Sequence, residues 1–377
     1  MSDLKVGSGR KFNFCAGPAV MPEVVLEQAR DEMMSYRGSG MSVMEISHRT
    51  PIADEMFEEA EENLRRLLAV PDGFRVIFLQ GGGQLQFSMV PMNFLHRGDV
   101  ANYIVTGHWG KKAIELAGLE GRAHVAWDGG VGGANYERVP LDAELDLEQG
   151  AAYTYFTSNE TIQGVQFASE PASAGPLVCD ASSDFLSRPV DLARYGLYYA
   201  CAQKNAGPSG LTVVLVSDEM LERQKGGLHK MLDYRRHADA GSRLNTPPMF
   251  AVYLFLLITR WIERDMGGLR SLAERNERKA QRLYGALDAL GDVFTTHAES
   301  ESRSRMNVTF RCVDAALDPI FLAQAEERGL MQLKGHRSVG GMRASIYNAM
   351  PEAGVEVLES LLEEFAASVR AGTLRAG

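Results

Sequence analysis

The alternation of short β-branched runs with helix-like segments is the feature that most constrains the fold of this chain. Six runs from Phe74 onward predict strands: FRVIFLQ, DVANYIVTG, AAYTYFT, PLVCDAS, LYYACAQK and LTVVLVS. Segments with helical spacing follow the first two of them, and this order predicts an α/β fold with a largely parallel sheet between helices. Ligands collect at the carboxyl ends of strands in such sheets, so the residues just after each run are the first candidates for function.

The pattern changes after Pro247-Pro248. One long helix is expected to about Asp265 and a second from Leu269 to about Leu290, followed by a strand, a helix, a strand and a closing helix. This order is typical of a separate α+β unit of roughly a hundred residues. We therefore expect an N-terminal segment (1–16) that packs with the small domain, a large α/β domain (17–267) and a small C-terminal α+β domain (268–377).

Charge and cysteine content narrow the class of protein. The net charge of −10 over 377 residues argues against a surface for nucleic acid or for an anionic membrane. The four cysteines lie far apart, and the longest apolar run, 249–258, is too short to span a bilayer. We expect a cytoplasmic protein without a disulfide frame and without a metal site.

Lys204 is the candidate centre of the chemistry. It ends the apolar run LYYACAQK and precedes the turn-forming residues NAGPSG. An amine in this position is expected to lose water, which would lower its pKa and free it to condense with a carbonyl. A solvated lysine at the start of a loop is the plainer interpretation of a single such residue.

Three further features follow predicted strands. Asp180 ends the run PLVCD, where its carboxylate could keep a pyridine nitrogen protonated or could cap a helix. The glycines at 81–83 could present backbone N–H groups to a phosphate, or could simply allow a tight turn. Trp109 could stack on a flat ring, although tryptophan is more often a packing residue.

Two His-Arg pairs are notable in an acidic chain. His336-Arg337 lies close before Arg343, and His48-Arg49 lies in the segment EISHRTP. The planar fork of arginine matches the oxygens of carboxylates and phosphates. An anion pocket and charges on surface loops both remain open at this point.

Long motifs that span most of the chain support the anion pocket. They are FNFCAGPA, SVMEISHR, NETIQG, FLSRPVDLARYGLYYACAQKNAGPSGLTVV, NTPP, SRMNV and LKGHRSVGGMRASIYNAMP. Together they resemble the phosphoserine aminotransferases, class V enzymes of the fold-type I group that depend on pyridoxal 5′-phosphate (PLP). The resemblance implies reversible transfer of the amino group of O-phospho-L-serine to 2-oxoglutarate, which gives 3-phosphohydroxypyruvate and L-glutamate in serine biosynthesis.

The resemblance implies a role for each strand-end residue. Lys204 would form the Schiff base with PLP and then move the α-proton, and Asp180 would meet the pyridine nitrogen. Thr161 would hydrogen-bond the ring hydroxyl, and Trp109 would stack on the ring.

The phosphate of PLP has its own implied ligands. The backbone N–H groups of Gly83 and Gln84 and the side chain of Gln203 would bind it. Asn245 and Thr246 would reach it from a second subunit, which implies an obligate homodimer with shared active sites.

The substrate is implied to meet charged residues at both ends. Arg343 would bind its α-carboxylate. His336, Arg337, His48 and Arg49 would surround the distal phosphate or the γ-carboxylate of glutamate, and the latter two would come from the partner chain. Two departures from the family pattern, Leu85 and Ala16, are expected to shift affinity without touching the lysine chemistry.

Other functions stay open beside this one. Another class V enzyme, such as an alanine or serine–glyoxylate aminotransferase, would leave the His-Arg pairs without a purpose. A cysteine desulfurase is disfavoured because no flexible loop follows Cys312. A noncatalytic phosphate-ligand protein would leave Lys204 as a loop residue, and 4-phosphohydroxy-L-threonine, from pyridoxine biosynthesis, is an alternative phosphorylated substrate.

Overall fold

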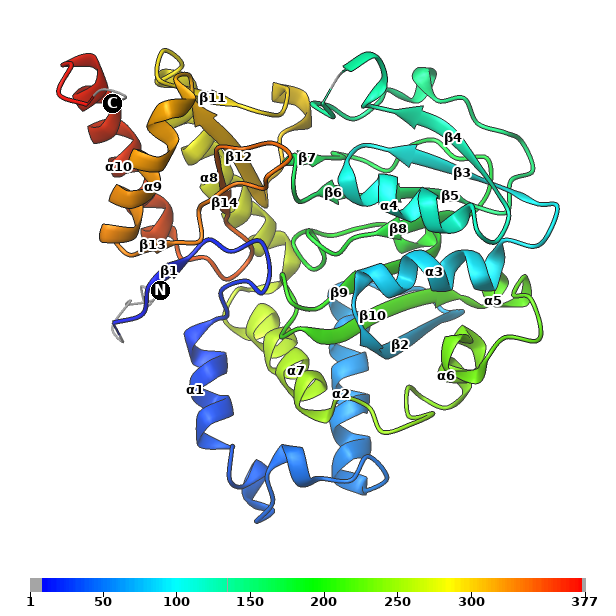
Figure 1. The fold of residues 1–377 in the computed structure, drawn as a ribbon. Coiled ribbons are helices and arrows are strands. Elements are labelled where there is room, and N and C mark those ends of the chain that lie inside the picture. Colours follow the sequence, from blue (N-terminus) through cyan, green and yellow to red (C-terminus); the bar gives the residue numbers. More distant parts are fainter. Residues whose placement is uncertain (1–8, 134, 375–377) are drawn as a thin grey trace.

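The centre of the computed structural model, which describes residues 9–133 and 135–374, is a seven-stranded sheet (Figure 1). The strands lie in the order β2, β10, β9, β8, β5, β3, β4. Their bounds are β2 Phe74–Gly81, β3 Val100–Val105, β4 Arg122–Asp128, β5 Thr154–Thr157, β8 Leu177–Asp180, β9 Tyr195–Cys201 and β10 Gly210–Ser217. Residues 1–8 of the expected N-terminal segment and residues 375–377 of the expected small domain lie outside the described residues.

The sheet is mainly parallel, as the sequence predicts. Strands β4, β3, β5, β8 and β9 pair in parallel, whereas β10 runs antiparallel to both β9 and β2. The exception has a local cause, because only residues 202–209 connect β9 to β10. A parallel pair needs a crossover of a dozen or more residues, so this short turn allows only the antiparallel arrangement.

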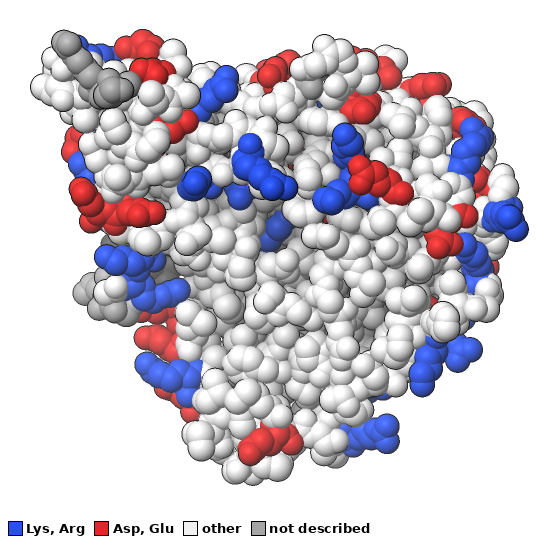
Figure 2. Space-filling view, in the orientation of Figure 1, with Lys and Arg blue, Asp and Glu red and all other residues white. Residues whose placement is uncertain are grey.

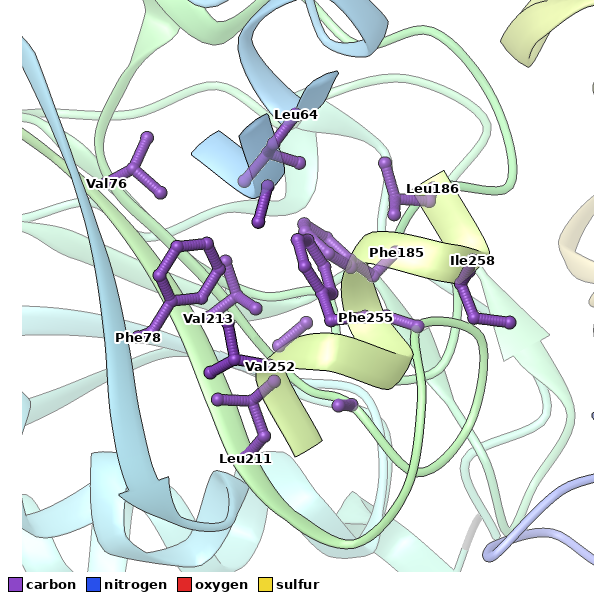
Figure 3. Packing of buried hydrophobic residues seen from close by; sticks show 14 of the residues in the cluster. Leu64, Val76, Phe78, Phe185, Leu186, Leu211, Val213, Val252, Phe255 and Ile258 are labelled. Atoms are coloured by element: carbon purple, nitrogen blue, oxygen red, sulfur yellow. The ribbon is translucent and has the colours of Figure 1, made fainter. Parts of the chain in front are cut away.

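Helices cover both faces of the sheet. They are α1 (Glu23–Asp31), α2 (Pro51–Leu67) and α7 (Met249–Arg264) on one face, and α3 (Gly83–Phe94), α4 (His108–Ala117), α5 (Asp218–Glu222) and α6 (Tyr234–Asp239) on the other. Side chains of β2 alternate between the two cores, with Phe78 in the first and Ile77 in the second. Figure 3 shows Phe78 and Val213 of the sheet packed against Phe255 of α7, and the ring centroids of Phe78 and Phe255 lie 5.3 Å apart.

A second, antiparallel sheet forms the core of the C-terminal part. Its strands are β11 (Phe294–Thr296), β12 (Asn307–Cys312) and β14 (Met342–Ser345), and its helices are α8 (Gly268–Ala289), α9 (Asp318–Glu327) and α10 (Glu352–Arg370). The short strand β1 (Phe12–Asn13) pairs in parallel with β13 (Leu330–Met331), and Phe14 is buried in this core. The domain boundary at 267/268 stays a prediction. No helix within the described residues combines the length and apolar character that crossing a membrane requires.

Buried amides and hydroxyls join the two sheets near the hairpin of β6 (Asn159–Glu160) and β7 (Val165–Gln166). Asn159 Nδ2 donates to Asn307 Oδ1 at 2.8 Å, and Asn307 Nδ2 donates to Ser345 Oγ at 2.9 Å. Asn348 Nδ2 donates to the carbonyl oxygen of Leu186 at 2.9 Å. These side chains are shielded from water. Their hydrogen bonds can therefore be kept only if the seven-stranded sheet and the C-terminal sheet stay in contact.

Lys279 of α8 fastens the segment that follows β14. Its side chain is 1% exposed, and its Nζ donates to the carbonyl oxygens of Ile346 and Tyr347 at 2.7 Å and to that of Met350 at 3.3 Å. Burial lowers the pKa of this amine well below its ordinary value. The three carbonyl oxygens are therefore what compensates a costly buried group.

Replacing Lys279 by methionine is expected to lower the free energy of unfolding by about 3 kcal/mol, because buried carbonyl oxygens would lose their donor. Urea unfolding followed by circular dichroism measures the change. The matched control is Arg278→Met on the same helix, where a 61% exposed side chain pairs with Glu352 at 3.4 Å and the expected loss is below about 1 kcal/mol. Equal losses in the two variants would contradict the role of Lys279.

Candidate active site

The carboxyl ends of four parallel strands bring the candidate residues together. Asp180 is the last residue of β8, and Lys204 lies in the turn after β9, its neighbour in the sheet. Thr161 follows the β6 strand that continues from β5, and Trp109 is the second residue of α4, just after β3. The parallel register places these ends at one edge of the sheet, as the strand pattern predicts.

Lys204 is held in place by a threonine. Its Nζ donates to Thr161 Oγ1 at 2.6 Å. Burial alone would lower the pKa of this amine, but Tyr347, Cys201, Asp180 and Glu160 outweigh burial and raise the pKa above its ordinary value. The low pKa expected from the strand-end position is therefore wrong, because that expectation took no account of the acidic groups contributed by other elements.

Asp180 is a buried acid beside this amine. Its side chain is 4% exposed, and its Oδ1 accepts from Ser182 N at 2.9 Å. Burial is the main cause of its raised pKa, and the Lys204 amine acts in the opposite direction. The residues after Asp180 form turns instead of a helix, so the capping alternative is wrong and the carboxylate remains free for a ligand.

The surroundings of Lys204 fit a flat, phosphorylated cofactor. The Nε1 of Trp109 and the Oε1 of Gln203 are buried without a hydrogen-bond partner among the described residues. Gly83 opens α3 beside the ends of β8 and β9, where a Cβ would lie 3.1 Å from Ser182 Oγ. Gln84 follows it on the exposed side. Unpaired polar groups and a helix N-terminus without a side chain are what a phosphate and a ring would satisfy.

An arginine that pairs with no carboxylate in the part of the chain that the structure describes lies at the same site. Arg343 Nη1 donates to the carbonyl oxygen of Thr161 at 3.4 Å. Burial lowers the pKa of Arg343, and Tyr347 and Cys15 act against this shift. His336 and the exposed Arg337 lie on the loop between β13 and β14, where His336 Nδ1 lies 2.8 Å from Ser338 Oγ. Figure 2 shows Lys and Arg side chains gathered over this loop and over the neighbouring α4.

Four predicted site residues lie elsewhere in this chain. His48 and Arg49 lie between η2 (Val43–Glu45) and α2, and Asn245 and Thr246 lie between α6 and α7. The segment that joins α1 to α2 lies at the opposite end of the molecule from the β13–β14 loop (Figure 1). His48 and Arg49 therefore lie away from the β13–β14 loop of their own chain, and the roles of all four residues stay predictions.

The sequence alone did not identify two residues of the site, Glu160 and His108. Glu160 is fully buried, and its carboxylate accepts from the backbone N–H of Trp109 at 3.1 Å and of Gly110 at 2.8 Å. His108 precedes Trp109, and its ring centroid lies 5.8 Å from that of His336. Each meets partners from distant segments, so spacing along the chain carried no signal for either. The only sequence cue for Glu160 was its position next to Thr161.

Comparison with known proteins identifies the family of this chain. Residues 11–358 match the family model described as aminotransferase class-V. The chain belongs to this family.

Within the family, the chain is similar to proteins named phosphoserine aminotransferase. The phosphoserine aminotransferase of Laribacter hongkongensis is 50% identical over 355 residues, which cover 94% of this chain and 98% of that protein. The solved phosphoserine aminotransferase of Bacillus circulans subsp. alkalophilus is 45% identical, with a TM-score of 0.93 and coverage of 96% of this chain and 99% of that one. The PLP-bound phosphoserine aminotransferase of Trichomonas vaginalis is 40% identical, with a TM-score of 0.89 and coverage of 94% and 100%.

Glu160 is expected to control the position of Trp109 in a pH-dependent way. Burial raises the pKa of this carboxyl to about 7, so below that pH it is protonated and holds the two backbone N–H groups less strongly. We expect the tryptophan fluorescence of the cofactor-free protein to change near pH 7, and Glu160→Gln to lose this transition. Glu115→Gln, at an exposed position on α4, the helix that carries Trp109, is the control. A transition that persists in Glu160→Gln would contradict this coupling.

Proposed function

We propose that this chain is a PLP-dependent phosphoserine aminotransferase. It would interconvert O-phospho-L-serine and 2-oxoglutarate with 3-phosphohydroxypyruvate and L-glutamate. The observation that carries the proposal is that the half-buried Lys204 donates to Thr161 and acts on the pKa of the buried Asp180, beside Arg343, which has no carboxylate partner among the described residues. The identity of nearly half of all residues with phosphoserine aminotransferases supports it over other class V enzymes.

Different residues of the site would bind different parts of PLP. Lys204 would hold it covalently, Asp180 would bind the ring nitrogen, and Trp109 and Thr161 would position the ring. The phosphate would meet the N-terminus of α3, with Gly83, Gln84 and Gln203 as its ligands in this chain. Bound there, PLP supplies an aldehyde that condenses with amines and a ring that accepts the electron pair released at the substrate Cα.

Lys204 moves the proton in this proposal. Once the substrate amine has displaced it, its Nζ is free to take the proton from the substrate Cα as a general base and to return it as an acid. Thr161 Oγ1 holds this nitrogen 2.6 Å away, which limits where the amine can point. Two half-reactions share the one site, so ping-pong kinetics are expected.

The charged residues would select the substrate. Arg343 would bind the α-carboxylate, and His336 and Arg337 the distal phosphate or γ-carboxylate. A glyoxylate-dependent aminotransferase would leave the last two without a ligand, and a noncatalytic phosphate-binding protein would not need Lys204 beside Asp180. The same pocket chemistry would accept 4-phosphohydroxy-L-threonine. The four free cysteines fit a reducing compartment, and we propose the cytoplasm.

A second copy of the chain would complete the site. His48 and Arg49 lie away from the β13–β14 loop of their own chain, and the segment before His48 exposes Met34 at 82% and Met44 at 62% of their surface. Below the charged cluster, Figure 2 shows a broad face with few charged side chains. A face with few charges and exposed methionines suits a protein interface, so we propose a homodimer with shared active sites.

Lys204→Ala is expected to abolish transamination, because no other amine replaces Nζ at the substrate. Absorbance spectroscopy of purified protein with added PLP tests the whole proposal. The visible band of the bound cofactor should shift with phosphoserine and return with 2-oxoglutarate in the natural protein, and neither change should occur in the variant. A variant that stays yellow and active would refute the role of Lys204.

Mixing two inactive variants tests the shared sites. Lys204→Ala subunits keep Arg49, and Arg49→Ala subunits keep Lys204, so a mixed dimer would contain one complete site of its two. We expect activity to appear after the two variants are unfolded and refolded together, up to about a quarter of the natural value if subunits pair at random. Each variant refolded alone is the control, and no gain on mixing would exclude sharing.

A further inference from the structure

His108 lies between the ring-binding tryptophan and the anion-binding loop. Its ring centroid is 5.1 Å from that of Trp109, edge to face, and 5.8 Å from that of His336. Its backbone N–H points to Gln163 Oε1 at 3.4 Å, at the first turn of α4. The half-buried imidazole is thus fixed by its neighbours on α4 and on the β13–β14 loop.

The groups around His108 are mainly cationic. Lys112, one turn further along α4, and His336 and Arg337 of the loop all lower the pKa of His108, and Glu115 raises it. The charged groups that lower the pKa of His336 are Arg343 and Arg337. Within the described residues, the two imidazoles thus lie side by side among more cations than carboxylates, and an anion between them would balance this charge.

We propose that His108 is a specificity-determining ligand of the substrate's distal phosphate, which it shares with His336 and Arg337. The proposal rests on the proposed function and names a residue that selects phosphate over carboxylate at that site. A phosphate presents three oxygens and close to two negative charges, enough for two imidazoles and an arginine at once. The γ-carboxylate of glutamate has two oxygens and one charge, and Arg337 with His336 can satisfy it.

Proton uptake is the signature of this arrangement. Burial and the neighbouring cations lower the pKa of His108 and of His336, so both imidazoles are neutral before an anion arrives. A bound dianion raises both pKa values, and binding must then take up protons. Affinity for phosphate therefore increases as pH falls from about 8 toward 7, where a phosphate with a second pKa of about 6 is still largely a dianion.

Kinetics with two amino donors test the selectivity. In His108→Ala we expect the KM for phosphoserine to rise about tenfold at pH 7.5, whereas the KM for glutamate changes less than about threefold and kcat is kept. His108→Gln retains one N–H donor without a titratable proton and is expected to regain part of the phosphoserine affinity. The exposed His229, before η6 (Lys230–Leu232), gives the matched control His229→Ala.

Binding of inorganic phosphate to the holoenzyme provides a readout without turnover. Calorimetry in two buffers of different ionisation enthalpy counts the protons taken up, and we expect uptake to fall in both His108 variants but not in His229→Ala. Equal phosphate affinity and equal proton uptake in natural protein and His108→Ala would overturn the proposal, as would equal KM changes for both donors. A natural protein that fails to transaminate phosphoserine would instead refute the proposed function.

Discussion

The site depends on the parallel pairing of β8 with β9. This pairing places a buried carboxylate, Asp180, and the turn that carries Lys204 at the same edge of the sheet. Neither group is tolerated alone in such a place, because a buried charge is costly without an opposite charge or a hydrogen bond. Each is stabilised by the other, and Thr161 takes up the remaining donor. The other strand ends then add the parts that a ring and a phosphate require.

The strand ends could be predicted from the sequence because the signal is local. Each apolar run of about six residues marks a buried strand, and its last residues mark the edge where Asp180, Lys204 and Trp109 meet. The antiparallel course of β10 was missed, although the short turn before it was visible. The long motifs identified the family, which the comparisons confirm, and this likeness alone suggested Thr161.

The rest of the site could not be predicted because its causes lie in distant contacts. Glu160 acts through backbone N–H groups of α4, and His108 gains its significance from a loop at the other end of the chain. The pKa of Lys204 depends on Tyr347, which lies in the segment after β14. Spacing along the chain reports none of these neighbours. The expectation from burial alone was therefore wrong in sign for Lys204.

The polar seam around Asn307 limits how the molecule can move. Apolar surfaces slide past one another at small cost, but each amide and hydroxyl of this seam has a fixed partner that water cannot replace without entering the core. A hinge rotation of the C-terminal sheet would break several of these bonds together. In the proposed function, a phosphate and a carboxylate would then be accommodated by side chains such as the exposed Arg337, within a frame whose two sheets keep their relative placement.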